Sequence, residues 1–413
     1  MQETTIANQQ QPWGKDVFTL LSWFEIDKVK NAKVMVVGAG ALGNEVLKNL
    51  ALFGVGHIVI VDFDKIEYSN LTRSILFRPE DADKGYYKAE IAAKRLKEIN
   101  PTIEVEAICG DLAADVGLGI YRRMDVVIGC LDNVWARILL NKQCFRVDRI
   151  WIEGGIGDLQ GQVSGYKLGV NCYRCSLEDE FTEEEAKISF SCHGDIQMNE
   201  EHGRLATTPI SASIIAAIQT QEAMKIIHKE AIEKGRFISL VGGMFRYEGA
   251  SNYAASSDFS PYYDDCPDHE YWNNIKEVPT LSADCPIKDA LAILRNFLKA
   301  EQVEINMLNN KFVKYLYLKD NPNKTFQVSM PFSKITEFIK NNDELVKEKN
   351  NLRHYSYENI NENEDEFPYQ KYQQYTLKQM GIPYFDIIQV TTEKGTFYVE
   401  LSADKQRYKT ILE

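Results

Sequence analysis

The chain has 413 residues, with 47 basic and 60 acidic side chains and a formal net charge of −13. This acidic balance argues against a general binder of nucleic acid or of membrane surfaces, and no apolar run reaches the roughly 20 residues of a membrane helix. The N-terminus lacks the charged start and apolar centre of a signal peptide. We therefore expect a cytoplasmic protein whose eight cysteines are mostly reduced and available for metal binding or catalysis.

The first part of the chain predicts an α/β domain. Phe18–Val29 indicates an amphipathic helix that leads into a sheet. Strand and helix patterns then alternate, which is typical of a doubly wound, mostly parallel, Rossmann-like sheet. The predicted segments are Val34–Val37, Ala41–Phe53, Ile58–Val61, Lys88–Ile99, Ile103–Ile108, Val126–Gly129, Val134–Arg146 and Ile150–Glu153.

A glycine turn follows the first strand. Gly38, Gly40 and Gly43 have the spacing G-x-G-x-x-G, and Asp62 ends the second strand. Glycine allows a tight turn and a close approach of phosphate, and the N–H groups at the start of the next helix face an anion. A carboxylate after the second strand can accept hydrogen bonds from ribose hydroxyls. These residues indicate a nucleotide, without saying which one.

Polar side chains beyond the turn favour ATP. Arg73 and Lys88 are cations suited to a polyphosphate, and Asp132 can hold Mg²⁺ at the carboxyl end of a strand, where open α/β sheets bind ligands. Two cations, a metal-binding acid and a ribose acid suit ATP better than hydride transfer. The full set after the glycine turn and Asp62 is Asp64, Asn70, Arg73, Lys88, Asp132 and Asn133.

The pattern changes after Gly161. A short strand at Gln162–Tyr166 precedes an acidic, turn-rich crossover loop, residues 176–208. The long helix Ile210–His228 is apolar nearly all round, which predicts that it is buried, at a subunit contact in our interpretation. Phe237–Val241 and Met244–Tyr247 are then expected to pair as a hairpin that ends this region.

We place a domain boundary near Ile275. Residues 1–275 would form the α/β domain, and residues 276–413 a smaller α+β domain of unknown role. In the second domain, Asn341–Asp365 is rich in Asn, Glu and Lys and predicts a solvated loop or mobile segment. The expected helix and strands are Ile287–Ala300, Val303–Met307, Phe312–Leu318, Thr325–Val328, Phe385–Val390 and Thr396–Leu401, the last two as paired strands.

Two short motifs predict a zinc site. Cys172 and Cys175 form a C-x-x-C motif, and Cys266 and His269 form a C-x-x-H motif. Together they supply four ligands for a tetrahedral zinc ion, which would tie the end of the sheet domain to a later segment. Cys285 is a rival for the fourth ligand. Chance pairing and a redox role of the C-x-x-C motif are the other interpretations.

Cys192 is a candidate nucleophile. It lies in the acidic crossover loop, beside His193 and two residues before Gly194, and not on an apolar periodic face. A thiolate is a strong nucleophile when a cation or a helix N-terminus favours it. The residues alone leave an ordinary loop thiol equally open.

The motifs GAGALG, IVDFDKIEYSNLTRSILF, GYYK, GCLDN and CYRC occur in this order. Over about residues 30–270, the chain therefore resembles the activating-enzyme superfamily, which comprises ubiquitin-like activating enzymes and sulfur-carrier adenylyltransferases. The resemblance implies a homodimer that adenylates the C-terminal glycine of a ubiquitin-like β-grasp protein with Mg-ATP. It assigns Gly38, Gly40 and Gly43 to the phosphates, Asp62 to the ribose, Asp64 to the nucleotide, Asn70, Arg73 and Lys88 to the triphosphate, Asp132 to magnesium, and Cys172, Cys175, Cys266 and His269 to zinc.

The resemblance also implies a role for Cys192. It matches the acceptor cysteine, which takes the β-grasp protein as a thioester before transfer to a conjugating enzyme. A sulfur-carrier route ending in a thiocarboxylate and a weakly catalytic adaptor are the alternatives. One departure is that Pro12–Asp27 lacks the arginine that the family uses at a partner subunit's ATP; Lys15 is the only cation there.

Overall fold

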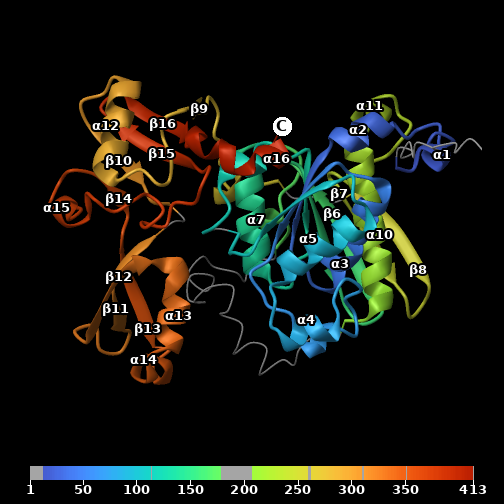
Figure 1. Cartoon of the computed structure of the whole chain (residues 1–413), viewed down its shortest axis with the longest axis horizontal. Helices are drawn as coiled ribbons and strands as arrows, with labels where there is room; N and C mark the ends of the chain where they lie inside the picture. Colours follow the sequence, from blue (N-terminus) through green and yellow to red (C-terminus); the bar gives the residue numbers. More distant parts are fainter. Residues whose placement is uncertain are drawn as a thin grey trace, which may run out of the picture.

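The computed structural model describes residues 13–112, 114–177, 207–258, 262–308, 311–349 and 351–412. Its largest sheet has eight strands in the order β3-β2-β1-β4-β5-β6-β7-β8, with helices on both faces (Figure 1). The first five strands in this order are parallel, and β6, β7 and β8 extend the sheet antiparallel. The strands are β1 (Lys33–Val37), β2 (His57–Val61), β3 (Glu104–Ile108), β4 (Val126–Gly129), β5 (Trp151–Ile156), β6 (Gln160–Tyr166), β7 (Gly243–Glu248) and β8 (Tyr253–Asp258).

The parallel strands form because their apolar runs are buried on both faces. Along β1, Val34 and Val36 face one core cluster, whereas Met35 and Val37 face the other. The helices α3 (Ala41–Phe53), α5 (Lys88–Ile99) and α10 (Pro209–Ile227) cover the first face, and α7 (Val134–Arg146) covers the second. The predicted Rossmann-like fold is confirmed, and α3, α5 and α7 have the predicted bounds.

One local prediction at the start of the chain needs correction. Phe18–Val29 is not one helix, because it holds the short helices α1 (Lys15–Phe18) and α2 (Ile26–Asn31) with a turn between them. The rings of Phe18 and Phe24 lie 4.6 Å apart and both stack on Phe53. Residues six positions apart on a helix point in clearly different directions, so this aromatic contact requires the turn.

The predicted hairpin of Phe237–Val241 with Met244–Tyr247 is also wrong. β7 pairs instead with β8, with Met244 opposite Ser257. The segment before β7 contacts α10 instead, since Leu240 N donates to Glu222 Oε2 at 2.8 Å. β8 escaped the sequence analysis because its small, polar side chains lie on an exposed edge and carry no apolar alternation.

Two smaller sheets use only residues beyond Ile275, where we predicted the second domain to begin; the boundary itself stays a prediction. One sheet has the order β14-β10-β15-β16-β9, and the other β12-β11-β13. The pairing of β15 with β16 confirms the last predicted strand pair. Their strands are β9 (Lys276–Glu277), β10 (Val303–Asn306), β11 (Phe312–Leu318), β12 (Thr325–Pro331), β13 (Leu352–Tyr357), β14 (Asn359–Ile360), β15 (Ile387–Thr392) and β16 (Gly395–Glu400).

Asn341–Asp365 is not the solvated loop that its composition predicts. Leu345, Leu352 and Ile360 are fully buried, and they anchor a helix and two strands within this polar stretch. The other α-helices among the described residues are α4 (Pro79–Asp83), α6 (Leu118–Tyr121), α11 (Lys229–Glu233), α12 (Ile287–Leu298), α13 (Ile335–Lys340), α14 (Asp343–Lys347), α15 (Tyr369–Tyr372) and α16 (Lys409–Leu412).

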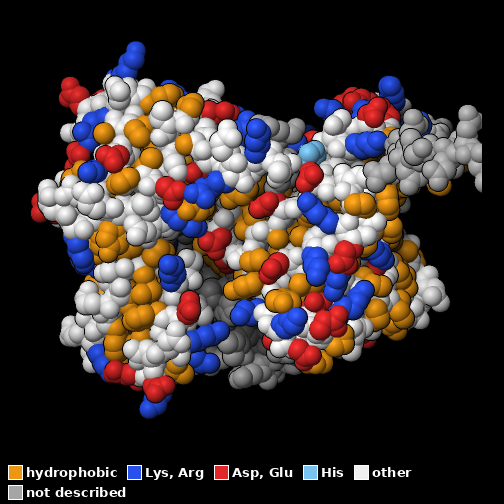
Figure 2. Space-filling model, viewed as in Figure 1, with side chains coloured by type: hydrophobic (Ala, Val, Ile, Leu, Met, Phe, Trp, Pro, Cys, Tyr) orange, Lys and Arg blue, Asp and Glu red, His pale blue; other side chains and the backbone are white. Residues whose placement is uncertain are grey.

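The visible surface carries charges of both signs. Acidic and basic side chains are intermixed around α4 in Figure 2, so no patch of one sign forms there. Among the described residues, no helix combines the length and the apolar character needed to cross a membrane.

An ionic cluster joins β16 of the C-terminal sheet to the two arginines that follow α6. Glu400 on β16 is fully buried, and it accepts hydrogen bonds from Arg122 at 2.9 Å and from Arg123 at 2.8 Å. Burial alone would raise the pKa of Glu400, but the bonds and charge of Arg123, with help from Ser402 and Arg122, lower it overall. The contact between β16 and the two arginines therefore depends on the ionised form of Glu400.

We expect Glu400→Gln to cost about 3 kcal/mol in the free energy of unfolding at pH 7, because two partly buried guanidinium groups lose the charge of their fully buried partner. Since the folded-state pKa lies below the unfolded one, this contribution is present above the unfolded pKa and disappears as pH falls through the folded pKa. Urea unfolding at several pH values should show the gap to wild type closing in acid. Glu277→Gln, at the exposed edge of the cluster, is the control with a small effect.

Candidate active site

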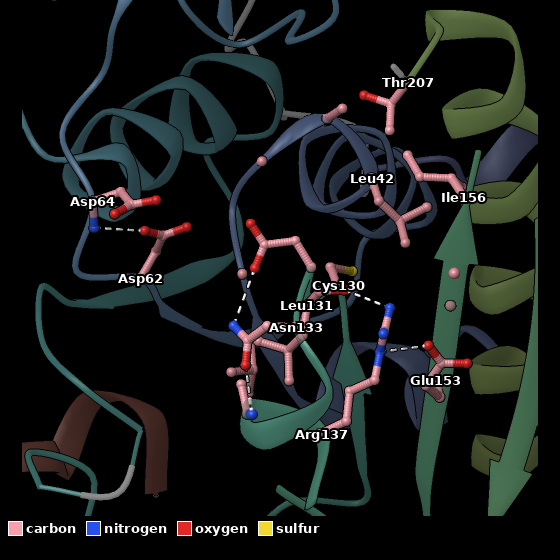
Figure 3. Close-up of a pocket in the computed structure, with 18 of the residues that line it drawn as sticks. Leu42, Asp62, Asp64, Cys130, Leu131, Asn133, Arg137, Glu153, Ile156 and Thr207 are labelled. Atoms are coloured by element: carbon pink, nitrogen blue, oxygen red, sulfur yellow. Dashed lines mark hydrogen bonds and ion pairs between the residues drawn. The ribbon is translucent and has the colours of Figure 1, made fainter. Parts of the chain in front are cut away.

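A cavity of about 1080 Å³ opens at the carboxyl ends of the central strands. It is lined by the residues at or just beyond the ends of β1, β2, β4 and β5, where β1 has neighbours from different parts of the chain on its two sides. This is the ligand-binding position of open α/β sheets. Figure 3 shows Asp62 and Asp64 at one end of the cavity, and Arg137 and Glu153 at the other.

The glycine turn lies as predicted between β1 and α3. Gly38 has φ +96°, and a Cβ there would lie 2.3 Å from the carbonyl oxygen of Cys130. A Cβ on Gly43 would lie 2.0 Å from the oxygen of Gly38, whereas one on Gly40 would meet no atom within 4 Å. Gly38 and Gly43 thus permit the tight turn, and Gly40 leaves its cavity side open to a ligand.

Asp62 holds the glycine turn and the following loop together. Its Oδ2 accepts the N–H of Ala39 at 2.6 Å, and its Oδ1 accepts the N–H of Asp64 at 2.8 Å. Burial raises the pKa of Asp62, while the charge of Lys88 and the two N–H groups act against this rise. Both oxygens therefore already have a structural role, and the predicted ribose contact would use their remaining lone pairs.

The predicted triphosphate residues all line this cavity. Lys88 Nζ lies 2.7 Å from Asp64 Oδ2, and the Lys88 side chain is largely buried at the first position of α5. Arg73 donates to the carbonyl oxygen of Ser69 at 2.8 Å, and Asn70 Oδ1 accepts the N–H of Glu67. The structure thus brings the two predicted cations together.

Asp132 and Asn133 follow β4 and line the cavity. Asn133 Oδ1 caps α7 by accepting the N–H of Ala136 at 2.7 Å, and its amide donates to Asp132 Oδ1 at 3.2 Å. The cap explains why an asparagine stands here. Asp132 is exposed, and its carboxylate offers the oxygen ligands that Mg²⁺ prefers.

Arg137 and Glu153 were missed by the sequence analysis. Arg137 Nε lies 2.9 Å from Glu153 Oε1, and Arg137 Nη2 donates to the oxygen of Leu131 at 2.7 Å. Burial raises the pKa of Glu153, and the charge of Arg137 acts against this rise. The rule that selected Asp132, a carboxylate at the carboxyl end of a parallel strand, would also have selected Glu153.

The four predicted zinc ligands meet in space. The ligand atoms of Cys172, Cys175, Cys266 and His269 all lie within 4.8 Å of one another, which confirms the predicted cluster. Cys285 lies elsewhere, near the carbonyl oxygen of Thr280, so it is not the fourth ligand.

The surroundings of this cluster fit a metal ion. Burial raises the pKa of the Cys266 thiol to about 11, so thiolates here need a cation to form. Asn141 donates to Cys172 Sγ at 3.2 Å, and the Tyr262 ring stacks on His269 at 3.8 Å. Two cysteines held in a rigid knuckle, a third cysteine and an oriented imidazole would bind zinc as a closed structural site.

The structure does not place two of the predicted residues, Cys192 and Lys15, at the cavity. Cys192 lies outside the described residues, so its role stays a prediction. Lys15 lies on α1, and it is not among the described residues that line the cavity. Thr207, at the end of the crossover loop, does line it.

Comparison with known proteins identifies the family. The sequence profile of the ThiF family matches residues 11–265. The chain belongs to the ThiF family. This confirms the resemblance to activating enzymes and sulfur-carrier adenylyltransferases that the sequence motifs indicate.

Relatives of this ThiF-family chain differ in pathway. SUMO-activating enzyme subunit 2 of Dictyostelium discoideum is 39% identical over 151 residues, which is 36% of this chain and 22% of that protein. The probable molybdopterin-synthase adenylyltransferase of Porphyra purpurea is 35% identical over 202 residues, 49% of each chain. The chain thus spans half or less of the length of these relatives. A crystal structure of E. coli MccB with succinimide has a TM-score of 0.46 and 25% identity, and covers 58% of this chain and 68% of that one.

Proposed function

We propose that this protein uses Mg-ATP to adenylate the C-terminal glycine of a ubiquitin-like β-grasp protein. The observation that carries the proposal is one continuous cavity with two unlike ends. One end combines the glycine turn with Arg73 and Lys88, which suits a triphosphate. The other end runs along Gly155 of β5, whose missing side chain leaves room for the tail of a second substrate. The names of the two relatives support activation of a carrier or modifier protein.

The chemistry follows from this arrangement. The glycine carboxylate attacks the α-phosphorus of ATP, and pyrophosphate leaves with the electron pair of the broken P–O bond. Negative charge on the phosphate oxygens is offset by Arg73 and Lys88. Bound Mg²⁺, for which Asp132 is our proposed ligand, supplies further charge neutralisation. The product is an acyl adenylate, which is a far better electrophile than the free carboxylate.

The next step would use Cys192. Its thiolate attacks the acyl carbon, AMP leaves, and a thioester forms before transfer to the cysteine of a conjugating enzyme. The Porphyra relative favours a second candidate, a sulfur-carrier route that ends in a thiocarboxylate. A weakly catalytic adaptor is the third, and the lack of an arginine in Pro12–Asp27 of the sequence favours it. We further infer that the protein is a homodimer and that it is cytoplasmic. Analytical sedimentation would test the dimer.

Incubation of the full chain with Mg-ATP and glycine-terminated β-grasp proteins encoded near it distinguishes these candidates. We expect ATP–pyrophosphate exchange that depends on the β-grasp protein, and an adduct that thiols release. The Cys192→Ala variant should keep the exchange and lose the adduct. Exchange without any adduct in wild type would support the sulfur-carrier route, and absence of exchange with every candidate would leave only the adaptor.

A further inference from the structure

One wall of the cavity belongs to a segment that also contacts the C-terminal domain. Gly110 and Leu112 line the cavity just beyond the end of β3. The N–H of Asp62 donates to the carbonyl oxygen of the last residue of β3 at 3.2 Å, so the segment begins beside the carboxylate predicted to contact ribose. It ends in α6, against residues 384–386. We call residues 110–112 and 114–119 the wall segment.

A single carboxylate links the cavity residues to the C-terminal domain. Asp115 Oδ2 accepts the N–H of Asp111, which lies between the two cavity residues, at 3.1 Å. Asp115 Oδ1 accepts a hydrogen bond from Lys378 Nζ, also at 3.1 Å. The N–H of Asp115 donates back to the carbonyl oxygen of Asp111 at 2.9 Å, which closes this turn of the wall segment. The backbone at the cavity and Lys378 thus share one carboxylate.

Main-chain groups at the start of α6 make a second, buried contact. Leu118 N donates to Asp386 Oδ1 at 2.9 Å, and Gly119 N donates to the carbonyl oxygen of Phe385 at 3.0 Å. The first N–H groups of a helix have no partner within the helix and need one outside it. A side-chain oxygen just before the helix commonly serves them, but Gly117 occupies that position here. The C-terminal domain therefore supplies the cap that α6 lacks in its own segment.

The fit between the two segments is close. A Cβ on Gly117 would lie 2.3 Å from the carbonyl oxygen of Tyr384, and one on Gly119 would lie 2.4 Å from that of Phe385. Phe385 is fully buried at φ +59°, a conformation that a bulky residue keeps only where its surroundings enforce it. Asp404 Oδ2 accepts the N–H of Phe385 at 3.0 Å. Both segments are therefore fixed where they meet.

Apolar packing connects the same places. Leu112, Val116 and Leu118 are buried with Phe385 and Ile387 in one hydrophobic cluster. Figure 1 shows the five-stranded C-terminal sheet on the α7 side of the large sheet, where this cluster lies. A close-packed interior has little free volume and transmits displacement. A shift of Ile387, which begins β15, therefore changes the surroundings of Leu112 at the cavity.

We infer that the C-terminal domain holds the wall segment in the conformation that binds nucleotide. Asp386 and Asp115 are the positioning residues of this link, because one caps α6 and the other ties Lys378 to the backbone at the cavity. The domain thus acts on nucleotide affinity although none of its described residues lines the cavity. The inference rests on the proposed function for the identity of the ligand, and it gives a role to the part of the chain beyond Ile275.

The test measures the Kd of the full chain for Mg-ATP by calorimetry. Asp386→Ala removes the acceptor for Leu118 N, whereas Asp386→Asn keeps an oxygen in its place. Gly119→Ala disturbs the same contact from the other side, since its Cβ would meet the oxygen of Phe385. Ile305→Val is the matched control, because it weakens the core of the same C-terminal sheet within a separate hydrophobic cluster. Thermal unfolding checks that every variant is folded.

We expect a Kd for Mg-ATP at least fivefold higher in Asp386→Ala and in Gly119→Ala, and within twofold of wild type in Asp386→Asn and Ile305→Val. The double variant Gly119→Ala/Asp386→Ala should bind no more weakly than the weaker single variant, because both changes break one contact. In pyrophosphate exchange, the KM for ATP should rise while the KM for the β-grasp protein stays unchanged. A merely structural role would lower the amount of folded protein and leave both KM values as they are.

Lys378→Met keeps the link testable if the buried changes prevent folding. Its side chain is partly exposed, and an ion pair of this kind contributes little to stability. We expect its Kd for Mg-ATP to exceed that of wild type about twofold at low ionic strength. The difference should vanish at about 1 M salt, which screens exposed charges. An unchanged Kd at low ionic strength would remove Asp115 from the link.

Linkage requires the reverse effect as well, so Mg-ATP should slow amide hydrogen exchange at Leu118 and Gly119 in wild type. Wild-type affinity for Mg-ATP in folded Asp386→Ala and Gly119→Ala would overturn the link and leave adenylation standing. Failure of wild type to bind Mg-ATP would contradict the proposed function instead. Faster exchange at Asp111 in Asp386→Ala would then still support the link between the two segments, and unchanged exchange there would overturn it too.

Discussion

The Lys88→Met variant is expected to lose at least 100-fold in kcat/KM for ATP–pyrophosphate exchange. Loss of one preorganised charge at a transition state costs about 100- to 1000-fold in other enzymes. Lys88 is preorganised here, because its ammonium group is held 2.7 Å from Asp64 and its stem is buried at the start of α5. Its conformational entropy is thus already lost before ATP binds. Methionine keeps the length and apolar body of the side chain and removes only the charge.

Lys94→Met provides the matched control, since it makes the same change on the exposed face of the same helix. It should leave exchange within about twofold, because a solvated charge outside the cavity is screened. ATP binding should be measured separately for both variants by calorimetry. Normal exchange by Lys88→Met would remove Lys88 from the site and, with it, the reason for placing the triphosphate between the glycine turn and α5.

The central sheet and the cavity at its carboxyl edge were predictable because local rules control both. The bounds of α3, α5 and α7 agree with the apolar periodicity, and the predicted polar residues follow strands whose carboxyl ends share one edge. Such positions need no knowledge of distant contacts. The Cys/His cluster was predictable for a similar reason, since each pair has a fixed local spacing and only the meeting of the two pairs required the fold.

The wrong and missed predictions depend instead on contacts between residues that are distant in the sequence. The turn after Phe18 depends on Phe53, which lies more than thirty residues away, and β8 is a strand only because β7 offers it an edge. Arg137 was missed because its partner Glu153 comes from a neighbouring strand. Periodicity within one segment contains no information about these contacts, so tertiary packing decides them.

Removal of the metal is the second change with a large expected effect. Cys172→Ser should reduce the zinc content from about one ion per chain to near zero, because three remaining ligands cannot close a tetrahedral site. The free energy of unfolding should fall by on the order of 4 kcal/mol or more, as is usual for loss of a structural metal. Metal analysis and thermal unfolding of the purified variant measure the two quantities. Cys285→Ser, which alters a cysteine outside the cluster, should change neither.

The loss of stability should extend from the metal site to the C-terminal sheet through specific contacts. Cys266 and His269 fix the segment that ends in Trp272, whose N–H donates to the oxygen of Arg146 at 2.9 Å. The Trp272 ring lies between the Arg146 guanidinium, at 4.7 Å, and the ring of Tyr398 on β16, at 4.8 Å. Once the metal is gone, the segment loses its anchor, and the contact between α7 and β16 loses its central ring.

Hydrogen exchange of Cys172→Ser should therefore accelerate in β16 and in the last turn of α7, while β1 and β2 stay protected. The Glu400 cluster joins the same sheet to Arg122 and Arg123, so exchange in β16 should rise further when Glu400→Gln is combined with Cys172→Ser. Full zinc content in the Cys172→Ser variant would reject the ligand set. Zinc loss with unchanged exchange in β16 would confine the metal to local stabilisation, because the ionic cluster and the other contacts of the C-terminal sheet would then hold it in place.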